Sequence, residues 1–102
     1  MAAKLDISEI QSAATELGKR YGAERIWLFG SYAKGDAALG SDVDLRIDKG
    51  NIRGLFALSG LRLALEDRLG VEVDLLTSDS LDDEFLDRIR TEEVLLYACE
   101  RT

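Results

Sequence analysis

Residues 29–45 read FGSYAKGDAALGSDVDL, and this stretch sets the fold and the chemistry expected of the chain. It follows a short apolar, β-favouring run at residues 25–29, and the residues after Gly30 and Ser31 favour a helical turn. Backbone N–H groups at such a strand-to-helix turn have no partner within the helix, so they favour an anion. Gly30 lets a phosphate approach the backbone closely, and the Ser31 hydroxyl adds a donor. The alternative is a tight turn in which Ser31 caps the helix.

The glycines of this stretch have the spacing of a P-loop but not its chemistry. Gly30 and Gly35 are placed as the two glycines of the pattern Gly-x-x-x-x-Gly-Lys-Ser/Thr. Asp36 stands where the lysine is needed, and a carboxylate there would repel the phosphates. The sequence therefore excludes a P-loop.

A pair of aspartates ends the stretch. Residues 42–48 alternate strictly between apolar and charged, so Asp42 and Asp44 project from the same face of a strand. Two neighbouring carboxylates repel each other unless a cation lies between them or one is protonated. Oxygen ligands of this kind suit Mg²⁺, whereas an EF-hand is excluded by Arg46 and Arg53 at ligand positions. The alternative is an exposed strand face with solvated charges.

A third acid lies further along the chain. Residues 71–76 alternate again, with Asp74 on the polar side. If this strand pairs with strand 42–48 through a helical crossover at 53–69, Asp74 comes alongside the two earlier aspartates. Three converging carboxylates can hold two divalent ions roughly 3.5–4 Å apart, as in phosphoryl and nucleotidyl transfer. The alternative for Asp74 is a polar edge position.

The periodicity of the remaining sequence predicts an alternation of helices and strands in one domain, residues 1–102. Helices are expected at 8–21, 53–69 and 81–91, ended or capped by Gly22, Gly70 and Ser80. Strands are expected at 25–29, 42–48, 71–76 and 94–97, the last as an edge strand. This order predicts an α/β (α+β) fold, a small mixed sheet of three or four strands with helices packed on it.

Composition excludes several classes of chemistry. The 102 residues include no histidine and one cysteine, Cys99, so histidine-dependent triads, histidine-containing zinc sites and internal disulfides are excluded. The lone cysteine fits a reducing, cytoplasmic compartment. The longest apolar run, at 94–99, has six residues, so no membrane span is expected. A net charge of -7 argues against direct nucleic-acid binding.

Two charged features remain open. The segment 79–93 holds seven acids and two arginines, a net of -5, and is either a solvated helix face or a contact surface for a basic partner. Arg46 shares the strand face of Asp42 and Asp44, where it could pair with them or contact a phosphate.

The motifs together resemble those of the nucleotidyltransferase superfamily that includes DNA polymerase β. The pattern Gly-Ser, ten residues, Asp-x-Asp is met by Gly30, Ser31, Asp42 and Asp44. A longer pattern is met through Ala33, Lys34, Gly35, Ser41 and Leu45, with Lys34 where many relatives have arginine. The chain most closely resembles the minimal nucleotidyltransferase (MNT) group, the antitoxins of HEPN/MNT toxin–antitoxin pairs.

The resemblance implies a polymerase β-like nucleotidyltransferase fold and a role for each motif residue. Gly30 and Ser31, with Ser41 in the nucleotide-binding set, would hold the nucleoside triphosphate. Asp42, Asp44 and Asp74 would be the catalytic residues and the ligands of two Mg²⁺ ions, and Asp74 would help to deprotonate the acceptor.

The implied activity is Mg²⁺-dependent transfer of AMP from ATP to a tyrosine of a partner HEPN ribonuclease toxin, which is thereby neutralised. Larger relatives carry a second, helical domain, and the chain ends within about thirty residues of Asp74, so a partner protein is expected to supply part of the acceptor site. Two alternatives are a binding-only antitoxin that masks the toxin by contact and the catalytic subunit of a small-molecule nucleotidyltransferase.

Overall fold

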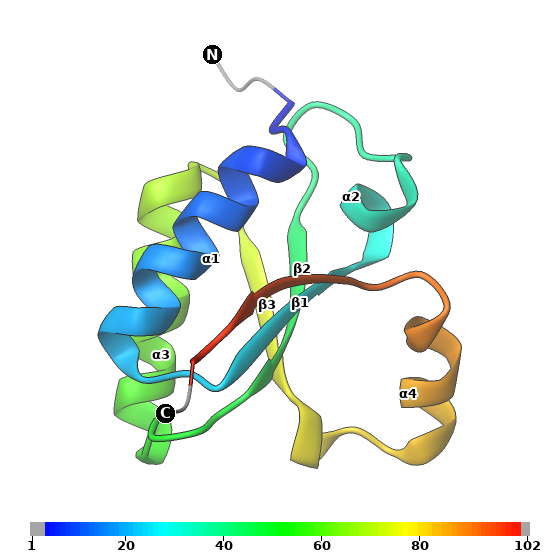
Figure 1. Ribbon diagram of the computed structural model, residues 1–102. Coiled ribbons are helices and arrows are strands. Elements are labelled where there is room, and N and C mark those ends of the chain that lie inside the picture. Colours follow the sequence, from blue (N-terminus) through cyan, green and yellow to red (C-terminus); the bar gives the residue numbers. More distant parts are fainter. Residues whose placement is uncertain (1–3, 101–102) are drawn as a thin grey trace.

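The computed structural model describes residues 4–100, which form a four-stranded sheet with helices beside it (Figure 1). The elements in chain order are α1 (Ile7–Tyr21), β1 (Arg25–Phe29), α2 (Gly30–Lys34), β2 (Val43–Asp48), α3 (Gly54–Leu69), β3 (Val73–Thr77), the 3₁₀ turn η1 (Ser78–Ser80), α4 (Asp83–Arg90) and β4 (Val94–Ala98).

The sheet is mixed, as the sequence predicts. Its strand order is β3-β2-β1-β4, so β3 and β4 form the two edges. β1 pairs antiparallel with both β2 and β4, whereas β2 and β3 run parallel and are joined through α3. A parallel pair requires such a crossover, and the α3 connection supplies it.

One face of the sheet carries the hydrophobic core. α1 and α3 pack together there, on the left of Figure 1, whereas α2 and α4 lie on the right. Alternate residues of the two central strands point into this core and are fully buried: Ile26 and Leu28 of β1, and Leu45 and Ile47 of β2. They pack with fully buried residues of the two helices, Ile10 of α1 and Leu61 and Leu65 of α3. The intervening residues of the same strands therefore face the other side, where Asp44 and Arg46 lie.

Helix and strand ends test the sequence predictions in detail. Gly22 and Gly70 end α1 and α3 in the left-handed conformation, with φ of 87° and 74°, as predicted. β2 begins at Val43, so Asp42 lies just before the strand. β3 begins at Val73, two residues later than predicted.

The predicted cap of α4 is wrong. Ser80 lies in η1, where its hydroxyl donates to the carbonyl of Thr77 at 2.8 Å. Asp82 caps α4 instead, because its Oδ1 accepts a hydrogen bond from the backbone N–H of Phe85 at 2.8 Å. The 3₁₀ turn after β3 takes up the serine and moves the helix start onward.

Candidate active site

The glycine turn lies directly against the aspartate strand. β1 ends at Phe29 and α2 begins at Gly30, whose φ is +74°. A Cβ atom placed on Gly30 would collide with Oδ2 of Asp44. Both the backbone conformation and the lack of space therefore require glycine here. Ser31 lies inside α2, so the alternative in which it caps that helix is wrong.

The neighbours of Ser31 hold the short helix in place. Tyr32 is only 4% exposed, and its hydroxyl accepts a hydrogen bond from the backbone N–H of Leu5 at 3.4 Å. Gly35 ends α2 with φ of +81°. The buried Tyr32 therefore anchors α2 to the core, while Gly30, at the start of the same helix, lies against Asp44.

Pairing of β2 with β3 brings the predicted acids together. Asp44 is the register partner of Asp74 across the parallel pair, and of Phe29 across the antiparallel pair with β1. The strand pairing predicted through the 53–69 crossover is therefore confirmed. Asp44 is half-buried, whereas Asp42 and Asp74 are exposed.

Electrostatics single out Asp44. The pKa of its carboxyl group is raised from the ordinary 3.8 to about 6, mainly by burial and then by the charge of Asp74, a hydrogen bond with Asp74 and the charge of Asp42. Each of these causes disfavours the ionised form. A cation at this point would reverse the effect, because it would stabilise the negative charge that the neighbours oppose.

The donor set fits Mg²⁺ better than a softer metal. Within residues 4–100, no three histidine, cysteine or acidic side chains enclose a common point, so the protein alone does not form a complete cage. Mg²⁺ ordinarily takes one or two carboxylates and completes its shell with water and substrate phosphates. Asp44, flanked by two solvent-exposed carboxylates, matches that requirement.

Ser41 shapes the loop that leads into the aspartates. Its hydroxyl accepts a hydrogen bond from the backbone N–H of Ala38 at 2.8 Å, and its own N–H donates to the carbonyl of Ala38 at 3.1 Å. These bonds close a turn immediately before Asp42. A nucleotide contact by Ser41 stays a prediction.

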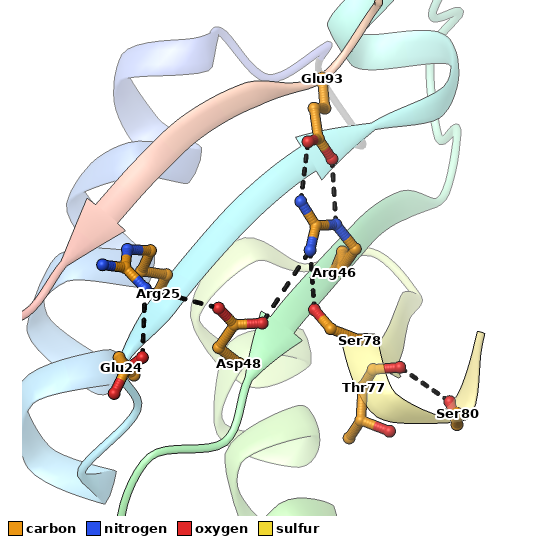
Figure 2. A network of polar contacts seen from close by, with 8 residues as sticks. All are labelled: Glu24, Arg25, Arg46, Asp48, Thr77, Ser78, Ser80 and Glu93. Atoms are coloured by element: carbon orange, nitrogen blue, oxygen red, sulfur yellow. Dashed lines mark hydrogen bonds and ion pairs between the residues drawn. The ribbon is translucent and has the colours of Figure 1, made fainter. Parts of the chain in front are cut away.

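Arg46 pairs with other residues than the three predicted site aspartates. Its guanidinium makes two bonds to Glu93, at 2.7 and 3.1 Å, and one to the Ser78 hydroxyl at 2.8 Å (Figure 2). It also stacks over the ring of Trp27 at 3.7 Å and is 7% exposed. Sequence reasoning placed Arg46 on the correct face but did not identify Glu93 or Ser78. The position of Arg46 between Leu45 and Ile47 on a buried strand could have indicated an acidic partner, because a buried charge requires one.

Comparison with known proteins agrees with this geometry. Residues 10–97 match the nucleotidyltransferase domain family. The chain belongs to that family. The protein adenylyltransferase MntA of Thermococcus cleftensis is 41% identical over 83 residues, which cover 78% of this chain and 84% of that protein. The domain match and this relative make the chain a nucleotidyltransferase.

Solved structures share the fold of this nucleotidyltransferase. A minimal nucleotidyltransferase superimposes with a TM-score of 0.77 at 33% identity, over 90% of this chain and 97% of that one. The MNT antitoxin complex with a tri-AMPylated HEPN toxin of Shewanella oneidensis matches with a TM-score of 0.69 over 90% of this chain and 72% of the matched chain. Its 20% identity establishes a common fold. Across residues 4–100, no helix is long and apolar enough to span a bilayer.

Proposed function

We propose that this nucleotidyltransferase is an antitoxin that transfers AMP from ATP to a tyrosine hydroxyl of a partner HEPN ribonuclease toxin and thereby neutralises it. The observation that carries the proposal is the position of Asp44, which touches the Gly30 turn on one side and pairs with Asp74 on the other. A triphosphate held at the turn would place its phosphates beside these carboxylates.

The chain's residues divide the work between binding and proton transfer. Gly30 and Ser31 would hold the β- and γ-phosphates, and Asp42, Asp44 and Asp74 would hold two Mg²⁺ ions. When bound, the metal ions supply positive charge for the developing phosphoryl and pyrophosphate oxygens. Asp74 is exposed, so it can also meet an acceptor hydroxyl from outside.

The transfer step balances without a further reactant. The acceptor oxygen forms a bond to the α-phosphorus as the bond from that phosphorus to pyrophosphate breaks. The acceptor proton passes to a carboxylate oxygen of Asp74 and then to solvent. The products are the adenylylated hydroxyl and pyrophosphate.

The partner is supported by the relatives. The Thermococcus protein is named a protein adenylyltransferase, and the Shewanella structure pairs an MNT antitoxin with an AMPylated HEPN toxin. The acceptor in those cases is a protein, and the exposed position of Asp74 is compatible with an acceptor that arrives on another chain.

The direct test is transfer of label to the partner. The protein is incubated with its HEPN partner, Mg²⁺ and ATP labelled at the α-phosphate, and parallel reactions use label at the γ-phosphate. We expect only the α-label to enter the partner, and only while Asp42 and Asp44 are intact. Asp67→Asn, an exposed change on α3, serves as the matched control and should transfer normally. Labelling by Asp44→Asn at the wild-type rate would contradict the proposal.

A binding-only antitoxin is the second candidate. It is favoured by α4, whose acids Asp83, Glu84 and Asp87 all point to solvent, where a basic toxin surface could meet them. The triple variant Asp42→Asn/Asp44→Asn/Asp74→Asn separates the two functions. Neutralisation by that variant would favour binding alone, whereas retained binding without neutralisation would favour transfer.

A further inference from the structure

The segment that joins the two edge strands crosses the polar face of the sheet. It consists of residues 78–93 and connects β3 to β4, which lie at opposite edges. It therefore contains η1, α4 and seven acidic residues that the proposed chemistry does not use. We call residues 78–93 the crossover segment.

Both ends of the crossover segment meet at one side chain. Ser78, its first residue, accepts a hydrogen bond from Nη1 of Arg46 at 2.8 Å. Glu93, its last residue, accepts two bonds from Nε and Nη2 of the same guanidinium, at 3.1 and 2.7 Å. Figure 2 shows this guanidinium between the two ends, with Asp48 beside it. A planar fork that binds a carboxylate through two bonds fixes direction as well as distance.

Two further residues of the crossover segment contact the two ends of the glycine turn and α2. Phe85 of α4 packs edge-to-face on Phe29, the residue before Gly30, with ring centroids 6.0 Å apart. Glu92 forms an ion pair with Lys34 at the end of α2, at 3.7 Å. The segment thus touches the phosphate-binding turn through two contacts of its own.

We propose that Arg46 is a positioning residue that clamps the crossover segment and so sets the glycine turn relative to Asp42 and Asp44. Arg46 lies two residues after Asp44 on the same strand and the same face. The clamp therefore connects β2, which carries the aspartates, to a segment that braces α2. The inference rests on the proposed function only in assigning nucleotide binding to the turn and the aspartates.

A single substitution of Arg46 would combine the loss of the clamp with a loss of stability. Glu93 has a side chain only 9% exposed, so Arg46→Met would leave a buried charge without its partner and destabilise the fold. The double variant Arg46→Met/Glu93→Leu removes both charges and keeps apolar volume, which restores stability in such pairs. It therefore removes the clamp while retaining the fold.

The experiment compares the double variant with the wild type at a temperature at which both are fully folded. Hydrogen exchange is measured on the amides of residues 82–92 and 30–36, and the Kd for AMP-PNP with Mg²⁺ is measured by calorimetry. We expect exchange in both regions to accelerate about tenfold or more, because the ends of the segment are released. We expect the Kd to rise by about tenfold, since small displacements of paired binding groups are costly.

Two further variants complete the design. Arg46→Lys keeps the charge but not the fork, so we expect intermediate exchange rates and an intermediate Kd. Arg90→Met removes an exposed arginine of α4 that forms an ion pair with Asp87 at 3.7 Å, and it should leave both measurements unchanged.

Wild-type exchange and a wild-type Kd in the double variant would overturn the proposal, because a purely structural role would then account for Arg46. Failure of the proposed function has a different signature. A wild-type protein that binds AMP-PNP but labels no HEPN partner would refute the transfer reaction, while the exchange measurement would still decide whether Arg46 clamps the segment.

Discussion

The two faces of the sheet contribute differently to the stability of the folded protein. The face covered by α1 and α3 buries apolar side chains such as Leu45 and Leu65 completely. On the other face, Asp44 lies half-buried beside Asp74, with a pKa raised to about 6. One face therefore stabilises the fold, and the other holds a carboxylate whose ionised form the fold disfavours. Changes on the two faces should separate activity from stability.

Asp44→Asn should have the largest effect, and that effect should be on activity. The variant keeps the shape of the side chain but loses the charge that we propose holds Mg²⁺, so nucleotidyl transfer should fall by about a thousandfold or more. The rate of label transfer from ATP measures the loss. A decrease of less than tenfold would place the metal site elsewhere.

Leu65→Ala, on the apolar face, should have the reverse signature. Leu65 is fully buried in the core, and its truncation should lower the free energy of unfolding by about 2–5 kcal/mol. Urea denaturation measures this cost. Activity per folded molecule should be unchanged at low temperature. A fall in this activity would mean that packing in the core affects the geometry of the site on the opposite face of the sheet.

Gly30→Ala tests the point where the glycine turn meets Asp44. The new Cβ would have an unfavourable φ of +74° and would collide with the Asp44 carboxylate. We expect a loss of about 2 kcal/mol in stability together with weaker binding of AMP-PNP. Gly40→Ala is the matched control, since it has a similar φ of +76° and open space around it. Equal losses in nucleotide binding for the two variants would refute a special role for the Gly30 contact.

The raised pKa of Asp44 predicts how the stability of the metal-free protein depends on pH. Between pH 4 and 6 the folded state retains a proton on Asp44 that the unfolded state has already lost. Stability from this group is therefore fully present below pH 4 and is lost as the pH rises through 6. After allowance for solvent screening, the change should be about 1–2 kcal/mol.

Thermal unfolding of the wild type and Asp44→Asn across this pH range isolates that contribution. The stability of Asp44→Asn relative to the wild type should increase as the pH rises to 7, and millimolar Mg²⁺ should reduce this difference in stability. A difference that does not vary with pH would mean that Asp44 titrates normally.

Asp82→Ala should have the smallest effect. It removes the cap of α4 and should cost about 1 kcal/mol. Asp87→Ala, an exposed acid on the same helix, is the control and should cost less. Chemical denaturation distinguishes the two, and equal costs would mean that the acidic charge matters more than the cap.

The sequence predictions succeeded best where a feature depends on residues that are close together in the chain. Apolar periodicity and glycine stops identified α1, α3 and the four strands, because these signals are local. Ser80 was mistaken for a cap because a serine before an apolar helix is a common cap, and nothing in the sequence indicated the 3₁₀ turn that contains it. The acidic trio was predicted through one assumed strand pairing, which the parallel register of Asp44 with Asp74 confirms.

The sequence alone determined the spacing of the glycine turn and the aspartates, and with it the family. Tertiary structure alone decided the partner of Arg46 and the pKa of Asp44. Glu93 lies 47 residues from Arg46 along the chain, and only the folding of β4 beside β1 brings the two together. Burial and neighbouring charge likewise exist only once the sheet has formed, because both depend on groups that the chain brings into contact on folding.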